Sequence, residues 1–128
     1  MSKNNDKKYK KKYMATREFS LSIQEPYLTL IKEGKKPVEG RPGEYKRFKN
    51  WIGKDIIFFN STKNIKVNVT DVKCYKDLYE YLEKVGYKNA IPNAINMQEA
   101  IDAYHKFYTD EKIKERGGMC GIFIKNID

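Results

Sequence analysis

Hydrophobic and polar residues alternate in several short segments of the chain, a pattern that predicts half-buried β-strands. We interpret five segments as strands, and they span residues 18–24, 36–41, 56–59, 65–72 and 119–127. Pro37 cannot donate a backbone hydrogen bond, so we expect residues 36–41 at the edge of a sheet or at the mouth of a barrel. The alternation breaks between Val69 and Val72, which predicts a β-bulge.

Other segments place hydrophobic residues three and four positions apart, which predicts amphipathic α-helices. A helix of about two turns follows Pro26, which suits a first helical turn, and ends before Gly34, which suits the position after a helix. A second helix is predicted from Asp77 and a third from Asn96, because each residue can cap a helix and has a glutamate three positions later. Residues 109–116 are charged and are interpreted as a helical extension.

The predicted order of elements is β-α-β-β-β-α-α-β. Five strands in a chain of 128 residues favour a small mixed β-barrel, closed or nearly closed, with flanking helices. The expected fold class is therefore α+β. We expect one domain over residues 17–128 and, before it, a disordered basic arm over residues 1–16, where lysine, asparagine and tyrosine dominate.

The positive charge is unevenly distributed along the chain. The formal net charge is +9, of which residues 1–17 carry +6. Residues 32–54 contain eight basic and three acidic residues, whereas residues 77–111 contain three basic and seven acidic ones. This separation favours a surface that contacts a polyanion such as nucleic acid, although a basic arm that is merely solvated would have the same composition.

The two cysteines, Cys74 and Cys120, are isolated and lack the spacing of a metal site. We expect two buried, unpaired thiols and therefore a reducing compartment, either the cytoplasm or the nucleus. No hydrophobic run is long enough to span a membrane, and no P-loop or dinucleotide-binding glycine motif is present. We expect no membrane association, no metal and no cofactor, and we also expect a monomer.

Three charged residues of one extended segment are the best candidates for specific chemistry. A two-residue period places Glu39 and Arg41 on one face of a strand, and Lys36 joins them only if the chain kinks at Pro37. A carboxylate can accept a hydrogen bond from an exocyclic amine, and an arginine can donate to carbonyl or phosphate oxygens. The same spacing also fits a salt-bridge ladder at the surface, so the residues alone leave both interpretations open.

Residues Gly34 to Arg41 resemble the GxKxxExR signature of the ASCH domain family, which is related to PUA domains. The preceding segment LSIQEPYLTLIKEG is similar to the opening segment of that family, and residues 51–58 resemble its strand leading into the barrel. Residues 79–108 resemble a block that is common in stand-alone members. The resemblance covers residues 19–127.

The resemblance implies a PUA-like barrel with a cleft lined by Lys36, Glu39 and Arg41. Members of the family are thought to bind RNA or modified nucleosides in this cleft. One bacterial branch resembles this fold used as an amidohydrolase that deacetylates N4-acetylcytidine. Lys36 would take the place of the catalytic lysine of that branch, and Glu39 stands where the branch has a catalytic threonine. The third catalytic residue of the branch, a glutamate after the barrel strands, has no assigned position here.

Two functional hypotheses follow. The first is an RNA-binding module whose cleft recognises a base or modified nucleoside while the basic segment and the arm contact phosphates. The second is a small hydrolase acting on such nucleosides or on the RNA backbone, with Lys36 and Glu39 as catalytic residues. The residues expected to bind ligand or RNA are Ser22, Gln24, Tyr27, Lys35, Lys36, Glu39, Arg41, Tyr45, Lys46, Arg47 and Trp51. Of these, Tyr27, Tyr45 and Trp51 are the candidates for base stacking, and Tyr27 and Trp51 also fit the hydrophobic core.

Overall fold

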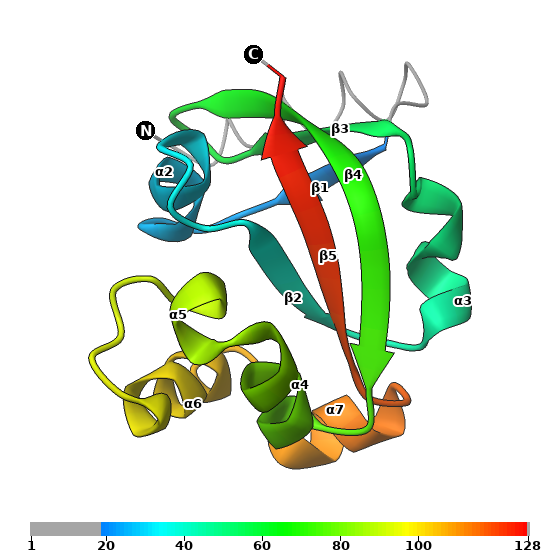
Figure 1. The fold of residues 1–128 in the computed structure, drawn as a ribbon, viewed down its shortest axis with the longest axis vertical. Coiled ribbons are helices and arrows are strands. Elements are labelled where there is room, and N and C mark those ends of the chain that lie inside the picture. The colour runs from blue at the N-terminus through cyan, green and yellow to red at the C-terminus, as the bar shows by residue number, and fades with distance from the viewer. Residues whose placement is uncertain (1–18, 128) are drawn as a thin grey trace.

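A mixed sheet of five strands forms the body of the protein in this computed structural model, which describes residues 19–127 (Figure 1). The strand order across the sheet is β1-β3-β4-β5-β2. The strands are β1 Ser20–Ser22, β2 Val38–Pro42, β3 Asp55–Phe59, β4 Asn64–Tyr75 and β5 Met119–Asn126. β1 pairs with β3 in parallel, and the other neighbours pair antiparallel. All five predicted strands are present.

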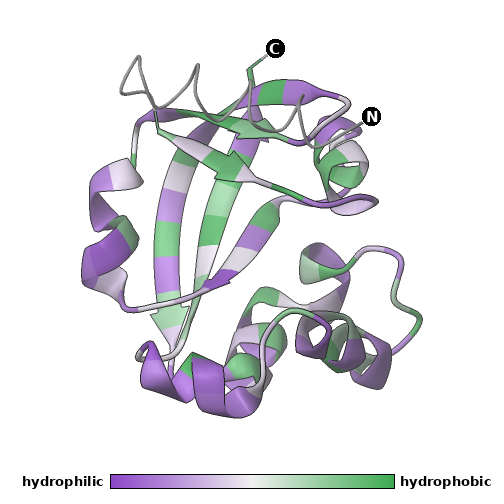
Figure 2. Cartoon of the chain, turned by 180° about the vertical axis from the view of Figure 1, so that it is seen from behind, coloured by the Kyte–Doolittle hydropathy of each residue, from purple (hydrophilic) through white to green (hydrophobic). Residues whose placement is uncertain are grey.

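The longest strand, β4, shows how the sequence pattern produces the sheet. Its residues alternate between buried and exposed positions, and Figure 2 shows the matching bands of hydrophobic and hydrophilic residues. The register shifts between Val69 and Asp71, after which Val72 is buried. The predicted bulge is confirmed, and it keeps hydrophobic side chains on the core face along the whole strand.

The sheet curls into a half-barrel that stays open. β1 and β2 lie at its two edges, so the predicted edge position of the segment after Pro37 is confirmed. The α+β class and the mixed sheet are also confirmed, but the expectation of a closed or nearly closed barrel is wrong. β1 has only three residues and pairs only with β3 within residues 19–127, so β1 and β2 stay unpaired with each other.

The helices lie in two places around the sheet (Figure 1). α4, α5, α6 and α7 gather at one end of the sheet, where α4 contacts β4 and β5 and α5 contacts β2. α2 and the pair formed by α3 and the 3-10 helix η1 lie outside this group. Their bounds are α2 Tyr27–Lys32, α3 Tyr45–Phe48, η1 Lys49–Trp51, α4 Leu78–Val85, α5 Tyr87–Ala90, α6 Met97–His105 and α7 Asp110–Glu115.

The predicted helix starts are confirmed by their caps. The Asp77 side chain accepts a hydrogen bond from the backbone N–H of Glu80 at 2.8 Å, and Asn96 accepts from that of Glu99 at 2.9 Å. Gly34 follows α2 with a φ of +78°, a conformation that favours glycine. The sequence did not predict α3, η1 or α5, because three or four residues are too few to show a helical period.

Two hydrophobic cores share the interior. One includes Leu28, Phe48 and Phe58 and joins α2 and α3 to the strands β3, β4 and β5. The other includes Tyr81 and joins the sheet to the helices α4 to α7. Tyr27 packs against both cores, so the start of α2 lies where they meet.

Cys74 and Cys120 form a disulfide bond, which corrects the expectation of two unpaired thiols. The two residues are register partners in β4 and β5, and their Cα atoms are 3.9 Å apart. Their sequence separation of 46 residues gave no sign of this pairing, because strand register alone brings them together. The predicted cytoplasmic or nuclear location loses the support of free thiols and stays a prediction.

Within residues 19–127, no helix is long and apolar enough to cross a membrane. The same residues contain no group of three or more histidine, cysteine, aspartate or glutamate side chains that could hold a metal ion. The predicted arm, residues 1–16, lies outside the described residues, so the boundary at residue 17 stays a prediction.

Candidate functional site

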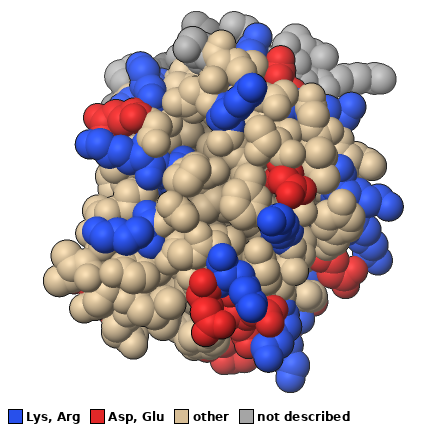
Figure 3. Space-filling view, viewed as in Figure 1, with Lys and Arg blue, Asp and Glu red and all other residues tan. Residues whose placement is uncertain are grey.

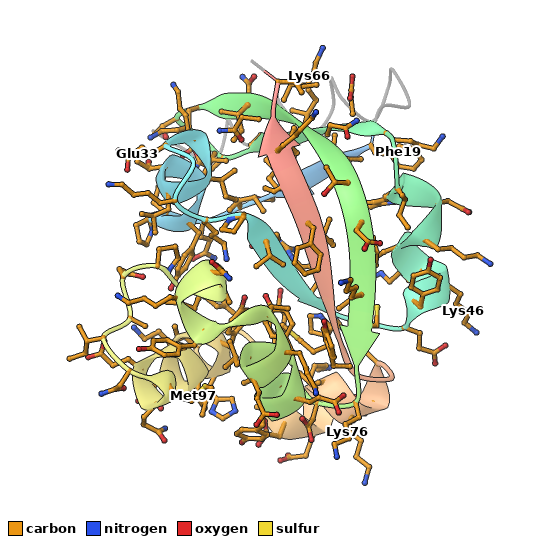
Figure 4. All side chains as sticks on the ribbon, in the orientation of Figure 1. Phe19, Glu33, Lys46, Lys66, Lys76 and Met97 are labelled. Carbon is orange, nitrogen blue, oxygen red and sulfur yellow. A yellow bond between two sulfur atoms is a disulfide. The ribbon has the colours of Figure 1, made fainter. Side chains whose placement is uncertain are left out.

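A cavity of about 140 Å³ opens at the junction of the two cores, and we call it the base pocket. The end of β1 and the start of α2 form one wall, β2 forms a second, and α6 with the residues after it forms a third. Figure 4 shows side chains filling the space between β2 and the helices below it. The volume corresponds to roughly ten water positions, which is the scale of one planar base and too small for a folded RNA helix.

Lys36 projects into the base pocket although its residue is only 3% exposed. Its ammonium donates to the backbone carbonyl oxygen of Ala90 at the end of α5, and it lies 5.5 Å from the centroid of the Tyr27 ring. Residues 35–37 precede β2 and are not in a regular strand. This break at Pro37 places Lys36 on the same side as Glu39, which a regular two-residue period would not do.

Glu39 connects the two basic side chains. Its Oε1 lies 3.6 Å from Lys36 Nζ, and its Oε2 accepts a hydrogen bond from Arg41 Nε at 3.0 Å. Arg41 Nη2 also donates to the backbone carbonyl oxygen of Ser22 at 2.7 Å. Because Ser22 ends β1 and Arg41 lies in β2, this guanidinium bridges the two edges of the open sheet.

The electrostatics of the base pocket follow from burial. Burial lowers the pKa of the Lys36 ammonium, and the nearby Glu39 carboxylate opposes this effect only in part. Burial and the same carboxylate raise the pKa of the Tyr27 phenol. The pocket therefore combines a lysine with a weakened preference for its charged form, one carboxylate and the Tyr27 phenol, which stays protonated at neutral pH.

Gly40 allows an unusually close approach behind this charged group. A Cβ atom at position 40 would lie 2.6 Å from the hydroxyl oxygens of both Tyr81 and Tyr104. These two hydroxyls share a hydrogen bond of 2.9 Å, and burial raises the pKa of each phenol. Tyr104 also lines the base pocket, so this buried pair of tyrosines lies next to the pocket wall.

Aromatic side chains from the third wall were missed at the level of sequence. Tyr104, Phe107 and Tyr108 line the base pocket, and Phe107 is 42% exposed at its rim. The Phe107 ring lies 6.3 Å from the Tyr27 ring between centroids, in an edge-to-face arrangement. The helical period that starts at Asn96 places Tyr104 and Tyr108 on its hydrophobic face, which predicts core residues and not a pocket lining. The signal that could have found the group is the density of aromatic residues at the end of α6.

The structure brings six of the predicted site residues together and separates the other five from them. The predicted residues that line the base pocket are Ser22, Gln24, Tyr27, Lys36, Glu39 and Arg41.

The other five predicted residues lie elsewhere on the surface. Lys35 pairs with Glu33 at 3.2 Å, and Lys46 projects outward from α3 in Figure 4. Tyr45 is exposed on the same helix, whereas Arg47 and Trp51 line a neighbouring groove. Any contact of these residues with RNA stays a prediction.

Comparison with known proteins identifies the family. The ASCH domain model matches residues 21–117. The chain belongs to the ASCH domain family. No curated protein matches the chain. Every residue that lines the base pocket falls within the range matched to the ASCH domain.

Two solved structures share the fold of this ASCH domain. The crystal structure of the hypothetical protein PH0355 is 35% identical with a TM-score of 0.75, and the match covers 86% of this chain and 99% of that one. The solution structure of protein PF0455 from Pyrococcus furiosus is also 35% identical, with a TM-score of 0.68 and coverage of 87% and 98%. The half-barrel with its flanking helices is therefore common to all three proteins.

Proposed function

We propose that this ASCH domain is an RNA-binding module whose base pocket holds one base or modified nucleoside. The observation that carries the proposal is the convergence of Lys36, Glu39 and Arg41 with aromatic side chains on a cavity of about 140 Å³. Single-stranded RNA is commonly recognised in this way, with an unstacked base between aromatic rings and hydrogen bonds to its polar edge.

The polar groups of the pocket match the edge of a base. The carboxylate of Glu39 can accept a hydrogen bond from an exocyclic amine, and the Tyr104 hydroxyl can donate to a carbonyl oxygen or ring nitrogen. Phe107 and Tyr27 supply rings against which a base could stack. Arg41 already donates hydrogen bonds to Glu39 and to the backbone carbonyl oxygen of Ser22. Its main role in this proposal is therefore to position Glu39.

The charge distribution supports a polyanionic partner. Figure 3 shows acidic side chains gathered at the end of the molecule where α4 and α7 lie. The basic residues 32–54 instead include β2, which lines the base pocket, and α3, which lines the neighbouring groove. In this proposal the basic segment over residues 32–54 and the arm over residues 1–16 contact phosphates and add a salt-dependent contribution to the affinity for RNA.

The test is a binding titration with a fluorescein-labelled single-stranded RNA of mixed sequence, about ten nucleotides long. We expect Lys36→Met and Phe107→Ala to weaken binding strongly, and deletion of residues 1–16 to weaken it while reducing its dependence on salt. Equal affinity of the wild type and both pocket variants would show that the pocket does not hold a base.

A second candidate function, hydrolysis of N4-acetylcytidine-type nucleosides, is favoured by the lowered pKa of buried Lys36. A neutral lysine amine can act as a base or nucleophile toward an acyl carbon. In the net reaction, water adds to the acetyl carbonyl, the bond to N4 breaks, and acetate and cytidine are released. However, Glu39 is the one carboxylate among the described residues that line the pocket, and Arg41 already binds it.

Incubation with N4-acetylcytidine separates the two functions. Release of cytidine that is lost in Lys36→Ala would establish the hydrolase. Absence of turnover together with RNA binding that depends on the pocket and on the arm would leave the binding module.

A further inference from the structure

A second cavity opens beside the base pocket, and we call it the arginine groove. It has a volume of about 260 Å³, and it shares Arg41 and Tyr108 with the base pocket. Its other walls include Arg47 from α3, Trp51 from η1 and Arg116 after α7. The two cavities are therefore neighbours, and Arg41 and Tyr108 lie between them.

The arginine groove is strongly positive. Three arginines line it, and none of its lining residues within the described part of the chain is acidic. Arg41 is neutralised by Glu39, but no carboxylate pairs with Arg47 or Arg116 within residues 19–127. Glu44 lies close to Gly117 and pairs with Lys46 at 3.5 Å. The charges of Arg47 and Arg116 are thus available to an anion.

The two free arginines differ in how firmly they are held. Arg47 donates through Nη1 to the carbonyl oxygen of Pro42 at 3.2 Å, and its guanidinium lies 5.0 Å from the centroid of the Phe48 ring. These two contacts restrain the guanidinium, and its other N–H groups have no partner within residues 19–127. Arg116 is exposed, and its side chain has no partner within residues 19–127. Arginine forks match the geometry of phosphate oxygens.

An aromatic surface lies beside the arginines. Trp51 packs against Phe19 and Phe48 with ring centroids 5.7 and 5.3 Å apart, and it remains partly exposed in the groove. An indole held by two neighbouring rings is a rigid platform on which a base can stack.

We propose that the arginine groove binds the backbone phosphate and the neighbouring nucleotide of the strand whose base occupies the base pocket. The inference rests on the proposed function and narrows it, because the ligand becomes an internal nucleotide of single-stranded RNA and not a free nucleoside. Arg47 and Arg116 contact the phosphate, and Trp51 stacks on the adjacent base. Tyr108 lies at the boundary between the two sites.

The experiment measures the affinity for the same labelled RNA of about ten nucleotides between about 50 and 200 mM KCl. We expect Arg47→Gln/Arg116→Gln to weaken binding about tenfold at low salt. The slope of log affinity against log salt should fall in magnitude by about 0.7, the value for one lost phosphate contact on a single strand. Arg116→Gln alone should show part of both effects, and it disturbs no contact within the described residues.

The matched control is Lys84→Gln/Lys125→Gln, which removes the same charge from two exposed residues that line neither cavity. We expect it to keep the wild-type slope. An equal loss in this control would overturn the proposal, because general attraction would then explain the effect. Thermal unfolding of each variant shows whether the fold is retained.

The pocket variants Lys36→Met and Phe107→Ala separate this inference from the function on which it rests. If the pocket variants weaken binding while the groove variants keep the affinity and the salt dependence of the wild type, the proposal for the arginine groove is wrong. The proposal for the base pocket is then retained. If only the groove variants weaken binding, the proposal for the base pocket is wrong and only the phosphate contact is supported. If neither set of variants loses affinity for the RNA, both proposals are wrong.

Discussion

Two neighbouring parts of one basic segment carry their charges in opposite ways. From Lys36 to Arg41 the charged side chains lie in a wall of the base pocket, and each contacts the next. From Glu44 to Lys49 the charged side chains face water, and the pair between Lys46 and Glu44 is at least half exposed on both sides. Both parts carry a net positive charge, although one lines a cavity with paired charges and the other is exposed to water.

The difference shows where an electrostatic interaction contributes to the stability of the fold. An exposed ion pair loses most of its Coulomb energy to water, whereas a buried one must be matched nearly completely. In the buried part, Lys36 has the Ala90 carbonyl oxygen and Glu39, and Arg41 has Glu39 and the Ser22 carbonyl oxygen. Glu39 is the partner that Lys36 and Arg41 share, so a substitution of Glu39 should show the largest difference in stability between the buried and the exposed part.

The largest effect is expected from Glu39→Gln. This change leaves Lys36 and Arg41 facing each other without the carboxylate between them. We expect the free energy of unfolding to fall by about 3–5 kcal/mol, as for other buried pairs that lose one partner. Urea denaturation followed by tryptophan fluorescence, with Trp51 as the probe, measures this change.

Glu44→Gln is the matched control in the exposed part. Glu44 pairs with Lys46, so the same substitution should change the free energy of unfolding by less than about 1 kcal/mol. Similar losses in the two variants would show that burial does not distinguish the two parts of the segment.

Gly40→Ala should have the next largest effect. The new methyl group would meet the hydroxyls of Tyr81 and Tyr104 at 2.6 Å, and both rings are buried. We expect a loss of about 2 kcal/mol from overpacking. Tyr104→Phe in the Gly40→Ala background should recover part of it, because one of the two clashing oxygens is gone. Failure of this rescue in thermal denaturation would place the strain elsewhere.

Much of the fold could be predicted from the sequence, because its strands and long helices have local signals. The alternation in β4, its bulge and the capping residues Asp77 and Asn96 all follow from periodicity and short-range hydrogen bonds. The fact that the barrel stays open could not be predicted in this way. The alternation predicted a strand over residues 18–24, whereas β1 spans only Ser20–Ser22, and strand order is set by contacts distant in the sequence.

The candidate site also combines residues with a local sequence signal and residues that only the topology brings together. The GxKxxExR segment gave Lys36, Glu39 and Arg41, but the side on which Lys36 lies depends on the break at Pro37. Tyr104 in α6 and Phe107 just after it lie some 65 residues away in the sequence, and the topology alone brings them to the pocket. The disulfide between β4 and β5 is likewise a product of strand register.

A third ionic cluster is intermediate between the two parts and tests the comparison by pH. Burial alone would raise the pKa of Glu25, but hydrogen bonds from Thr29, Asn60 and Lys63 outweigh it and lower the pKa to about 2. The stabilisation is therefore present above the ordinary pKa and is lost as the pH falls from about 4.5 towards 2. The Glu25 side chain is 38% exposed, so we expect a contribution of about 1 kcal/mol after screening by water.

Glu25→Gln isolates this contribution. The wild type should be more stable than the variant at neutral pH, and the two curves should converge as the pH approaches 2. A constant difference across this range would show that packing, and not ionisation, holds the corner before α2.

The smallest effect is expected at Lys46, and it tests whether the two parts also differ in function. Lys46→Gln removes an exposed charge, so the free energy of unfolding should change by less than about 0.5 kcal/mol. The affinity for the labelled RNA should fall about twofold at low salt, and the difference should vanish at physiological ionic strength, where exposed charges are screened. The loss in Lys36→Met should persist there, because a base held in the pocket is bound by stacking and short hydrogen bonds. If both losses disappear with salt, the pocket contributes only charge, and the distinction between the buried and exposed parts is one of stability alone.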